Sequence, residues 1–272
     1  MLCRMITALL PIIGASLYAQ TIPNLVESIA AHPPQVQLAQ GQAMGEEVSF
    51  PSGSLTLKGF IYKPAGAGPF PALIWNHGSE KLPGWQPELA AFYNIKGFVF
   101  FIPHRHGQGR SPGEYIVDLT NASQWKETVR LHEIYNEDVR SAVRWLTSQP
   151  FVDSKRVIMS GVSYGGIQTL LSAEAGLGIR GFIPFAPAAM SWANLELRKR
   201  LLVAVKNAKA PVFLLQAAND YSTGPSETLG PAITKKGGLN RAKLYPAFGT
   251  TPQQGHGAFA MWDIGTRLWG RT

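Results

Sequence analysis

The sequence contains little cysteine and little charge. A single cysteine, Cys3, occurs in 272 residues, and only 15% of the residues are Asp, Glu, Lys or Arg. Because we expect the segment that holds Cys3 to be removed, the mature chain can form neither a disulfide nor a thiolate metal site. The sequence also lacks an internal repeat, which argues against a solenoid. Its 45% hydrophobic content instead predicts one domain with a sizeable core.

Residues 1–19 have the features of a secretory signal peptide. One arginine precedes a broken apolar run, and Leu17-Tyr18-Ala19 suits cleavage after Ala19. The run is short for a membrane span, so we expect a secreted or periplasmic protein with no stable membrane insertion after cleavage. A retained membrane anchor is the alternative. Residues 20–45 are rich in Gln, Pro and Ala and are predicted to form an extended N-terminal arm.

The formal net charge of +8 raises the question of a nucleic-acid partner. The basic residues are scattered and no nucleic-acid-binding motif occurs, so we predict a basic surface and no nucleic acid. A metal site at His104 and His106, with Asp118 or His132, is a weaker hypothesis because the spacing matches no familiar ligand set. We therefore expect no metal and no cofactor.

Two stretches fit the nucleophile pattern Gly-x-Ser-x-Gly, namely residues 109–113 and 161–165. In hydrolases with this pattern, the backbone N–H of the residue after the serine helps to hold the oxyanion of the transition state. In the first stretch Ser111 is followed by Pro112, which has no N–H to donate. The first stretch is therefore a poor candidate for the chemistry.

The second stretch has the strand and helix that the motif requires. Residues 156–160 are predicted to form a buried strand, and residues 164–175 place apolar side chains on one helical face. Small residues beside the serine allow a tight turn between the two elements. Ser163 is therefore the candidate nucleophile, and the N–H of Tyr164 is a candidate oxyanion donor.

A serine needs a base, and the base needs an orienting acid. In hydrolases with this motif the chain order is Ser, then Asp or Glu, then His. The only histidine after Ser163 is His256, and the only aspartate between them is Asp220, which follows the predicted buried strand 211–216. Glycines on both sides of His256 suggest a mobile loop tip. Three glutamates, Glu174, Glu196 and Glu227, compete with Asp220. Glu174 and Glu196 lie in predicted helical segments, so Glu227 is the alternative acid that we retain.

The second oxyanion donor is expected after an earlier strand. Residues 71–76 are predicted to form this strand, and His77-Gly78-Ser79 follows it. The glycine allows a turn that directs N–H groups inward, so the N–H of Ser79 is the second candidate donor. His77 is interpreted as a structural hydrogen-bonding residue.

Together these segments resemble the α/β-hydrolase superfamily, in particular the group of dienelactone hydrolases and prolyl-oligopeptidase-like enzymes. The resemblance runs from about Glu47 to the C-terminus and includes the loop 105–111, which we expect to pack behind the oxyanion loop. It implies an α/β fold over residues 46–272, with a mostly parallel twisted sheet of about eight strands, helices on both faces and a minimal lid. Dienelactone hydrolases carry cysteine where this chain has Ser163, so their lactone chemistry does not transfer.

The predicted function is hydrolysis of carboxylic esters of small molecules through an acyl-enzyme intermediate. Ser163 would attack the carbonyl, His256 would transfer the proton, and Asp220 would orient the imidazole. The same residues could cleave amides or peptides or transfer the acyl group to an alcohol. A binding protein on a hydrolase scaffold is the third alternative, although a binding protein does not need the complete set.

Substrate size is predicted from the short connections. Little chain separates the strand 182–185 from the following helix, so residues 114–133, before a predicted helix at 138–146, are the insertion that could roof the site. Trp125, Trp192 and Tyr221 are the predicted pocket walls. A shallow pocket would favour acetyl to butyryl esters, because further methylenes gain no burial once they reach water.

Overall fold

The computed structural model describes residues 45–121 and 123–270. The predicted signal peptide and residues 20–44 of the predicted arm lie outside the described residues, and those predictions stand as made. Within the described part, no helix is both long enough and apolar enough to cross a membrane.

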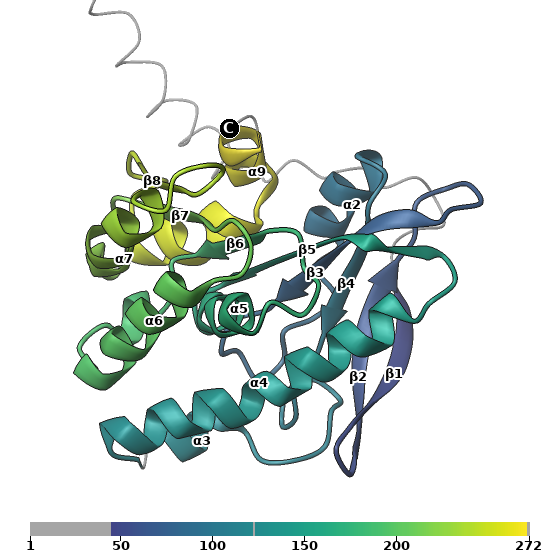
Figure 1. The fold of residues 1–272 in the computed structure, drawn as a ribbon, viewed down its shortest axis with the longest axis horizontal. Helices are drawn as coiled ribbons and strands as arrows, with labels where there is room; N and C mark the ends of the chain where they lie inside the picture. Colours follow the sequence, from purple (N-terminus) through teal and green to yellow (C-terminus); the bar gives the residue numbers. More distant parts are fainter. Residues whose placement is uncertain (1–44, 122, 271–272) are drawn as a thin grey trace, which may run out of the picture. The chain divides into compact units, whose positions relative to one another are not determined.

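The described domain is built on one eight-stranded sheet with the order β1-β2-β4-β3-β5-β6-β7-β8 (Figure 1). β1 pairs with β2 and β2 with β4 in antiparallel orientation, whereas all pairs from β4 to β8 are parallel. The prediction of a mostly parallel α/β-hydrolase sheet is confirmed. The strands are β1 Glu46–Ser52, β2 Leu55–Tyr62, β3 Phe70–Asn76, β4 Val99–Pro103, β5 Val152–Val162, β6 Phe182–Phe185, β7 Phe213–Ala217 and β8 Arg241–Tyr245.

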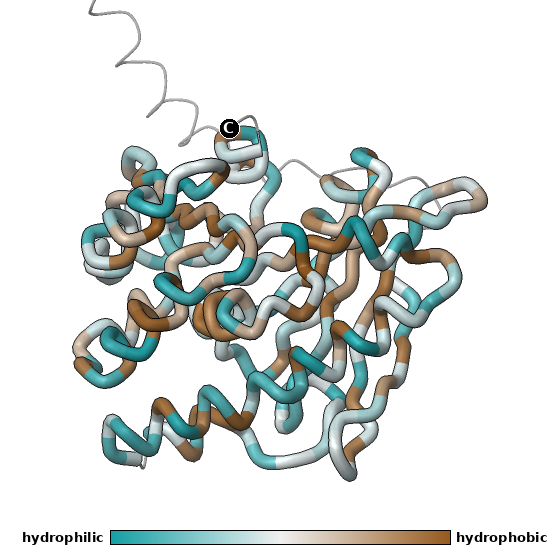
Figure 2. Tube along the Cα trace, in the orientation of Figure 1, coloured by the Kyte–Doolittle hydropathy of each residue, from teal (hydrophilic) through white to brown (hydrophobic). Residues whose placement is uncertain are grey.

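Helices cover both faces of this sheet. Alternation along β3 sends Ala72 and Ile74 to the core beneath α4, α5 and α6, and Leu73 and Trp75 to the core beneath α2 and α9. Central strands buried on both faces are continuous apolar runs, which appear as brown segments in Figure 2. The helices are α2 Pro87–Ile95, α3 Ile116–Asn121, α4 Trp125–Thr147, α5 Tyr164–Ala175, α6 Leu195–Asn207, α7 Gly224–Thr234, α8 Phe259–Met261 and α9 Asp263–Trp269, with the short helical turns η1 Ala189–Ser191 and η2 Gln254–Ala258.

The insertion that was predicted to roof the site is mostly helical. Helix α4 begins at Trp125, well before the helix that the sequence suggested from Asp138, so most of the insertion 114–133 is helical. Its buried residues Thr128, Leu131 and His132 recur at helical spacing along one face. The connection after β6 is short, with only η1 before α6. The described part of the insertion therefore forms a largely helical wall.

Candidate active site

Ser163 occupies the sharp turn between β5 and α5. Its backbone has φ 59° and ψ −116°, a conformation that non-glycine residues rarely adopt, and its N–H donates to the carbonyl of Phe185 on β6 at 3.0 Å. The flanking glycines are needed because a Cβ on Gly165 would lie 1.8 Å from the carbonyl oxygen of Asn76, and one on Gly161 would lie 2.6 Å from it. The turn therefore holds Ser163 at the carboxyl end of the parallel strands.

Ser111 of the first serine motif has a different role. Its hydroxyl donates to the carbonyl of His104 at 2.8 Å and accepts from the N–H of Lys58 at 2.9 Å. The first bond closes the loop after β4 on itself, and the second ties that loop to strand β2. The hydroxyl is therefore used in structure.

Asp220 and His256 form a buried hydrogen-bonded pair. Nδ1 of His256 lies 2.8 Å from Oδ1 of Asp220, which also accepts from the N–H of Tyr221 at 2.7 Å. The second carboxylate oxygen accepts from Nε2 of Gln216 at 2.9 Å. These contacts fix the carboxylate, and the carboxylate orients the imidazole so that Nδ1 donates and Nε2 can accept a proton.

Nε2 of His256 has no hydrogen-bond partner among the described residues. Asp220 follows β7 and Ser163 follows β5, so both lie beyond the carboxyl ends of parallel strands, where such sheets place their ligands. Catalytic hydrogen bonds are often formed only in the substrate complex. The arrangement leaves one basic nitrogen free for a serine proton.

None of the three glutamates bonds to His256. Glu227 lies in the first turn of α7 and accepts from the hydroxyl of Thr223 at 2.6 Å. Glu174 pairs with Arg200, and Glu196 with Lys199, on helices α5 and α6. Of the four acids compared, only Asp220 contacts the imidazole.

The setting of His256 corrects the expectation of a mobile loop tip. The residue lies in the helical turn η2, and only 7% of its surface is exposed. Gly255 is packed so closely that a Cβ there would lie 2.5 Å from Oδ1 of Asn219. The ring of Tyr221 stands edge-on to the imidazole, with 5.3 Å between centroids. Gly255 thus permits close packing of this turn against Asn219.

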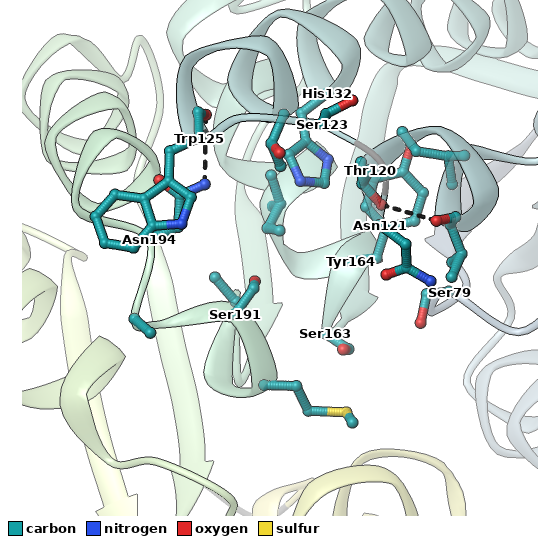
Figure 3. A pocket seen from close by; sticks show the side chains of 17 residues that line it. Ser79, Thr120, Asn121, Ser123, Trp125, His132, Ser163, Tyr164, Ser191 and Asn194 are labelled. Atoms are coloured by element: carbon teal, nitrogen blue, oxygen red, sulfur yellow. Dashed lines mark hydrogen bonds between the residues drawn. The ribbon is translucent and has the colours of Figure 1, made fainter.

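The two candidate oxyanion donors lie on the same cavity as Ser163 (Figure 3). Tyr164 is the first residue of α5, so its N–H has no acceptor within the helix. Among the hydrogen bonds of the described residues, neither this N–H nor that of Ser79 has an acceptor. Both are available for a developing negative charge.

Arg105 supports the loop that carries Ser79. The guanidinium is buried, and its Nη2 donates to the carbonyl oxygens of His77 at 2.8 Å and Gly78 at 2.7 Å. Gln108 adds a bond from Nε2 to the carbonyl of Glu80 at 2.7 Å. The expectation that the loop 105–111 packs behind the loop that carries Ser79 is confirmed. Arg105 itself was not singled out from the sequence.

His77 is held neutral in this cluster. Burial, then the positive charge of Arg105 and of His104, hold its pKa well below the usual value. Its Nδ1 lies 3.0 Å from the carbonyl of Gly78 and 2.9 Å from Nη2 of Arg105, so the ring is fixed between the loop backbone and the guanidinium. The structural interpretation of His77 agrees with this contact.

A cavity of about 460 Å³ lies beside Ser163. Helix α3 and the first turns of α4 form one side, and η1 with the residues after it forms the other (Figure 3). It is lined by Ser79, Ile116, Val117, Thr120, Asn121, Ser123, Trp125, Thr128, His132, Ser163, Tyr164, Ile167, Ala188, Met190, Ser191, Ala193 and Asn194.

The three aromatic residues predicted as pocket walls do not all line the cavity. Trp125 lines the cavity. Trp192 does not line it, because it is buried in the core against Gly224, where a Cβ would lie 2.1 Å from the indole nitrogen. Tyr221 is 41% exposed beside His256 and lies outside the lining. His132, which the sequence suggested only as a weak metal ligand, does line the cavity.

The other histidines of the weak metal hypothesis have separate partners. Nε2 of His104 lies 2.9 Å from the carbonyl of Gly84, and Nδ1 of His106 lies 2.6 Å from a carboxylate oxygen of Asp138. Within residues 45–121 and 123–270, no three His, Cys, Asp or Glu side chains converge on one point. Their contacts are those of structural residues.

The sequence matches a known protein family. Residues 53–229 match the family model of the X-Pro dipeptidyl-peptidase (S15 family). The polyketide transferase grgF of a Penicillium species is 28% identical over 149 residues, which are 54% of this chain and 46% of that protein. The thiohydrolase apmlB of Arthrinium phaeospermum is 24% identical over 181 residues, 61% of this chain and 52% of that protein. The matches span about half the length of these relatives.

Solved structures share the fold. The uncomplexed acylaminoacyl peptidase of Pyrococcus horikoshii superposes with a TM-score of 0.64 at 17% identity, over 83% of this chain and 39% of that chain. Est1E of Butyrivibrio proteoclasticus, solved with ferulic acid bound, gives a TM-score of 0.60 at 16% identity, over 82% of this chain and 98% of that chain. At such identities the likeness concerns the fold.

Proposed function

The chain belongs to the X-Pro dipeptidyl-peptidase (S15) family within the α/β-hydrolase superfamily, and we propose that it hydrolyses carboxylic esters of small molecules. The observation that carries the proposal is the oriented pair of Asp220 and His256, on the same edge of the sheet as a serine held in a strained turn. The family and its relatives support a hydrolase or an acyltransferase. The ester as substrate is the proposed step.

In the proposed reaction, Oγ of Ser163 attacks the acyl carbonyl while Nε2 of His256 takes its proton. The N–H groups of Ser79 and Tyr164 hold the oxyanion of the tetrahedral intermediate. The intermediate collapses to an acyl-enzyme, and the imidazolium returns the proton to the departing alcohol. A water molecule, deprotonated by His256, then releases the acid and regenerates the serine. Asp220 stabilises the imidazolium throughout.

The cavity favours an ester over a dipeptide. A dipeptidyl-peptidase substrate carries an ammonium group near the bond that is cleaved, and burying that charge without a partner is costly. Among the described residues that line the cavity, none is Asp, Glu, Lys or Arg. An uncharged ester or thioester meets no such cost.

Acyl transfer is a second candidate. The curated relatives include a polyketide transferase and a thiohydrolase, and the acyl-enzyme is common to hydrolysis and transfer. An alcohol that enters the cavity in place of water would accept the acyl group. We propose that the reaction takes place in a secreted or periplasmic protein, which sequencing the N-terminus of the mature chain would test.

A substrate panel tests the proposal. We expect turnover of p-nitrophenyl acetate and butyrate, with kcat/KM flat or falling for longer acyl chains and no activation at a lipid interface. We expect a Gly-Pro p-nitroanilide to be turned over far more slowly, and Ser163→Ala to remove ester turnover. Efficient cleavage of the anilide with negligible ester turnover would contradict the proposal and favour the peptidase.

A further inference from the structure

His132 is a buried polar side chain on the cavity wall. It lies on α4, is only 6% exposed, and its buried Nδ1 has no hydrogen-bond partner among the described residues. Its ring is tilted against that of Tyr164, with 5.0 Å between centroids. In Figure 3 the ring projects into the space that the labelled residues surround. A buried imidazole without a partner is unfavourable unless another molecule supplies one.

Several other polar groups of the lining are already satisfied. The hydroxyl groups of Thr120, Ser123 and Thr128 donate to carbonyls within their own segments. The amide of Asn194 caps α6 by accepting from the N–H of Leu197 at 3.0 Å. The three hydroxyl groups have thus used their only hydrogens, and the amide oxygen of Asn194 is already engaged.

The phenol of Tyr164 is the other buried lining group without a hydrogen bond. Its ring packs against the guanidinium of Arg105, 4.3 Å from the ring centroid to the guanidinium carbon. This contact accounts for its position. His132 has no equivalent contact with a charged or polar group.

His132 is uncharged at neutral pH. Burial, with a further contribution from the positive charge of Arg105, lowers its pKa to about 3. A neutral imidazole has one donor nitrogen and one acceptor nitrogen, which suits a hydroxyl group because a hydroxyl can donate or accept. It offers no counter-charge to a carboxylate or an ammonium group.

We infer that His132 is a specificity-determining residue. It hydrogen-bonds a hydroxyl group on the half of an uncharged ester, acyl or alcohol, that enters this cavity. The inference rests on the proposed ester hydrolysis and names its substrate class. Either half of an ester could carry the hydroxyl, so the experiment includes both.

The test compares matched ester pairs. One arm uses p-nitrophenyl esters of hydroxybutyric and hydroxyhexanoic acids against the unsubstituted acids, and the other uses hydroxypropyl butyrate against propyl butyrate. We expect kcat/KM to be about tenfold higher for the hydroxylated member in one arm, the effect of one additional hydrogen bond. In His132→Phe, which keeps a ring against Tyr164, the ratio should fall to about one.

Further variants separate recognition from folding. His132→Asn retains a donor and an acceptor and should restore part of the preference. Ile134→Val, on the exposed side of α4, is the matched control and should keep the full ratio. A ratio near one in the unaltered protein for both arms, with normal turnover of plain esters, would overturn the inference alone. Absence of turnover for every ester would overturn the proposed function, and the inference with it.

Discussion

The guanidinium of Arg105 lies over the ring of Tyr164, with its central carbon 4.3 Å from the ring centroid. The same group donates to the carbonyls of His77 and Gly78, immediately before Ser79. One buried cation therefore contacts the segments that carry both candidate oxyanion donors. No carboxylate bonds to this guanidinium among the described residues.

Replacing Arg105 tests this support. Arg105→Lys keeps a charge but loses the bond from Nε to Gln108 at 3.1 Å and the planar group that lies over Tyr164, so the loop that carries Ser79 should shift. We expect kcat on p-nitrophenyl butyrate to fall by roughly 10- to 100-fold, with a smaller change in KM. Arg110 is an exposed arginine of the loop 105–111, which also holds Arg105, so Arg110→Lys should leave kcat unchanged. Equal loss in the two variants would refute a specific role for Arg105.

The acid of the triad is tested by amide substitution. Asp220→Asn preserves size but presents a donor to Nδ1 of His256, which disfavours the useful tautomer. We expect kcat to fall on the order of 10² to 10⁴-fold. Glu227→Gln should have nearly normal kcat, because Glu227 bonds to Thr223 instead. The assignment would be wrong if the Glu227 variant were inactive and the Asp220 variant active.

The turn at Ser163 should be intolerant of a single methyl group. A Cβ at Gly165 would lie 1.8 Å from a backbone oxygen, whereas a Cβ at Gly181 would lie 3.8 Å from its nearest neighbour. We expect Gly165→Ala to reduce the free energy of unfolding by about 3 kcal/mol or more. Gly181→Ala should change it by less than about 0.5 kcal/mol, as measured by urea denaturation. Similar values for the two would show that the turn can relax.

Buried histidines predict acid sensitivity. Burial lowers the pKa of His104 to about 4, so between that pH and about 6.5 the unfolded chain binds a proton that the folded chain does not. The free energy of unfolding therefore falls as the pH falls through this window, and is constant above it with respect to this group. His104→Gln should reduce the loss between pH 7 and 5 by roughly 2 kcal/mol. An unchanged loss, measured by urea denaturation, would contradict the pKa direction.

Local patterns in the sequence predicted the elements around Ser163 well. The helix at Tyr164–Ala175 was predicted with its observed ends, because a strand, a glycine-flanked serine and an amphipathic run lie next to each other in the chain. The predicted helix began at Asp138, whereas α4 begins at Trp125, more than three turns earlier. The first half of α4 is rich in polar residues, and its helical periodicity is recognisable only when the buried face is known.

Features that depend on distant contacts could not be predicted. The glycines beside His256 indicated mobility, but the structure leaves no room for a Cβ at Gly255, because Asn219 lies against it. Trp192 looked available as a pocket wall, yet it is packed in the core. The unpartnered Nδ1 of His132 follows from the packing of α4 against α5, and no residue near it in the sequence signals that state.

Covalent labelling with a fluorophosphonate tests the central claim most directly. The account predicts one adduct per chain, located on Ser163 by peptide mass spectrometry, lost in Ser163→Ala and retained in Ser111→Ala. An adduct on Ser111, or labelling that survives in Ser163→Ala and disappears in Ser111→Ala, would contradict it.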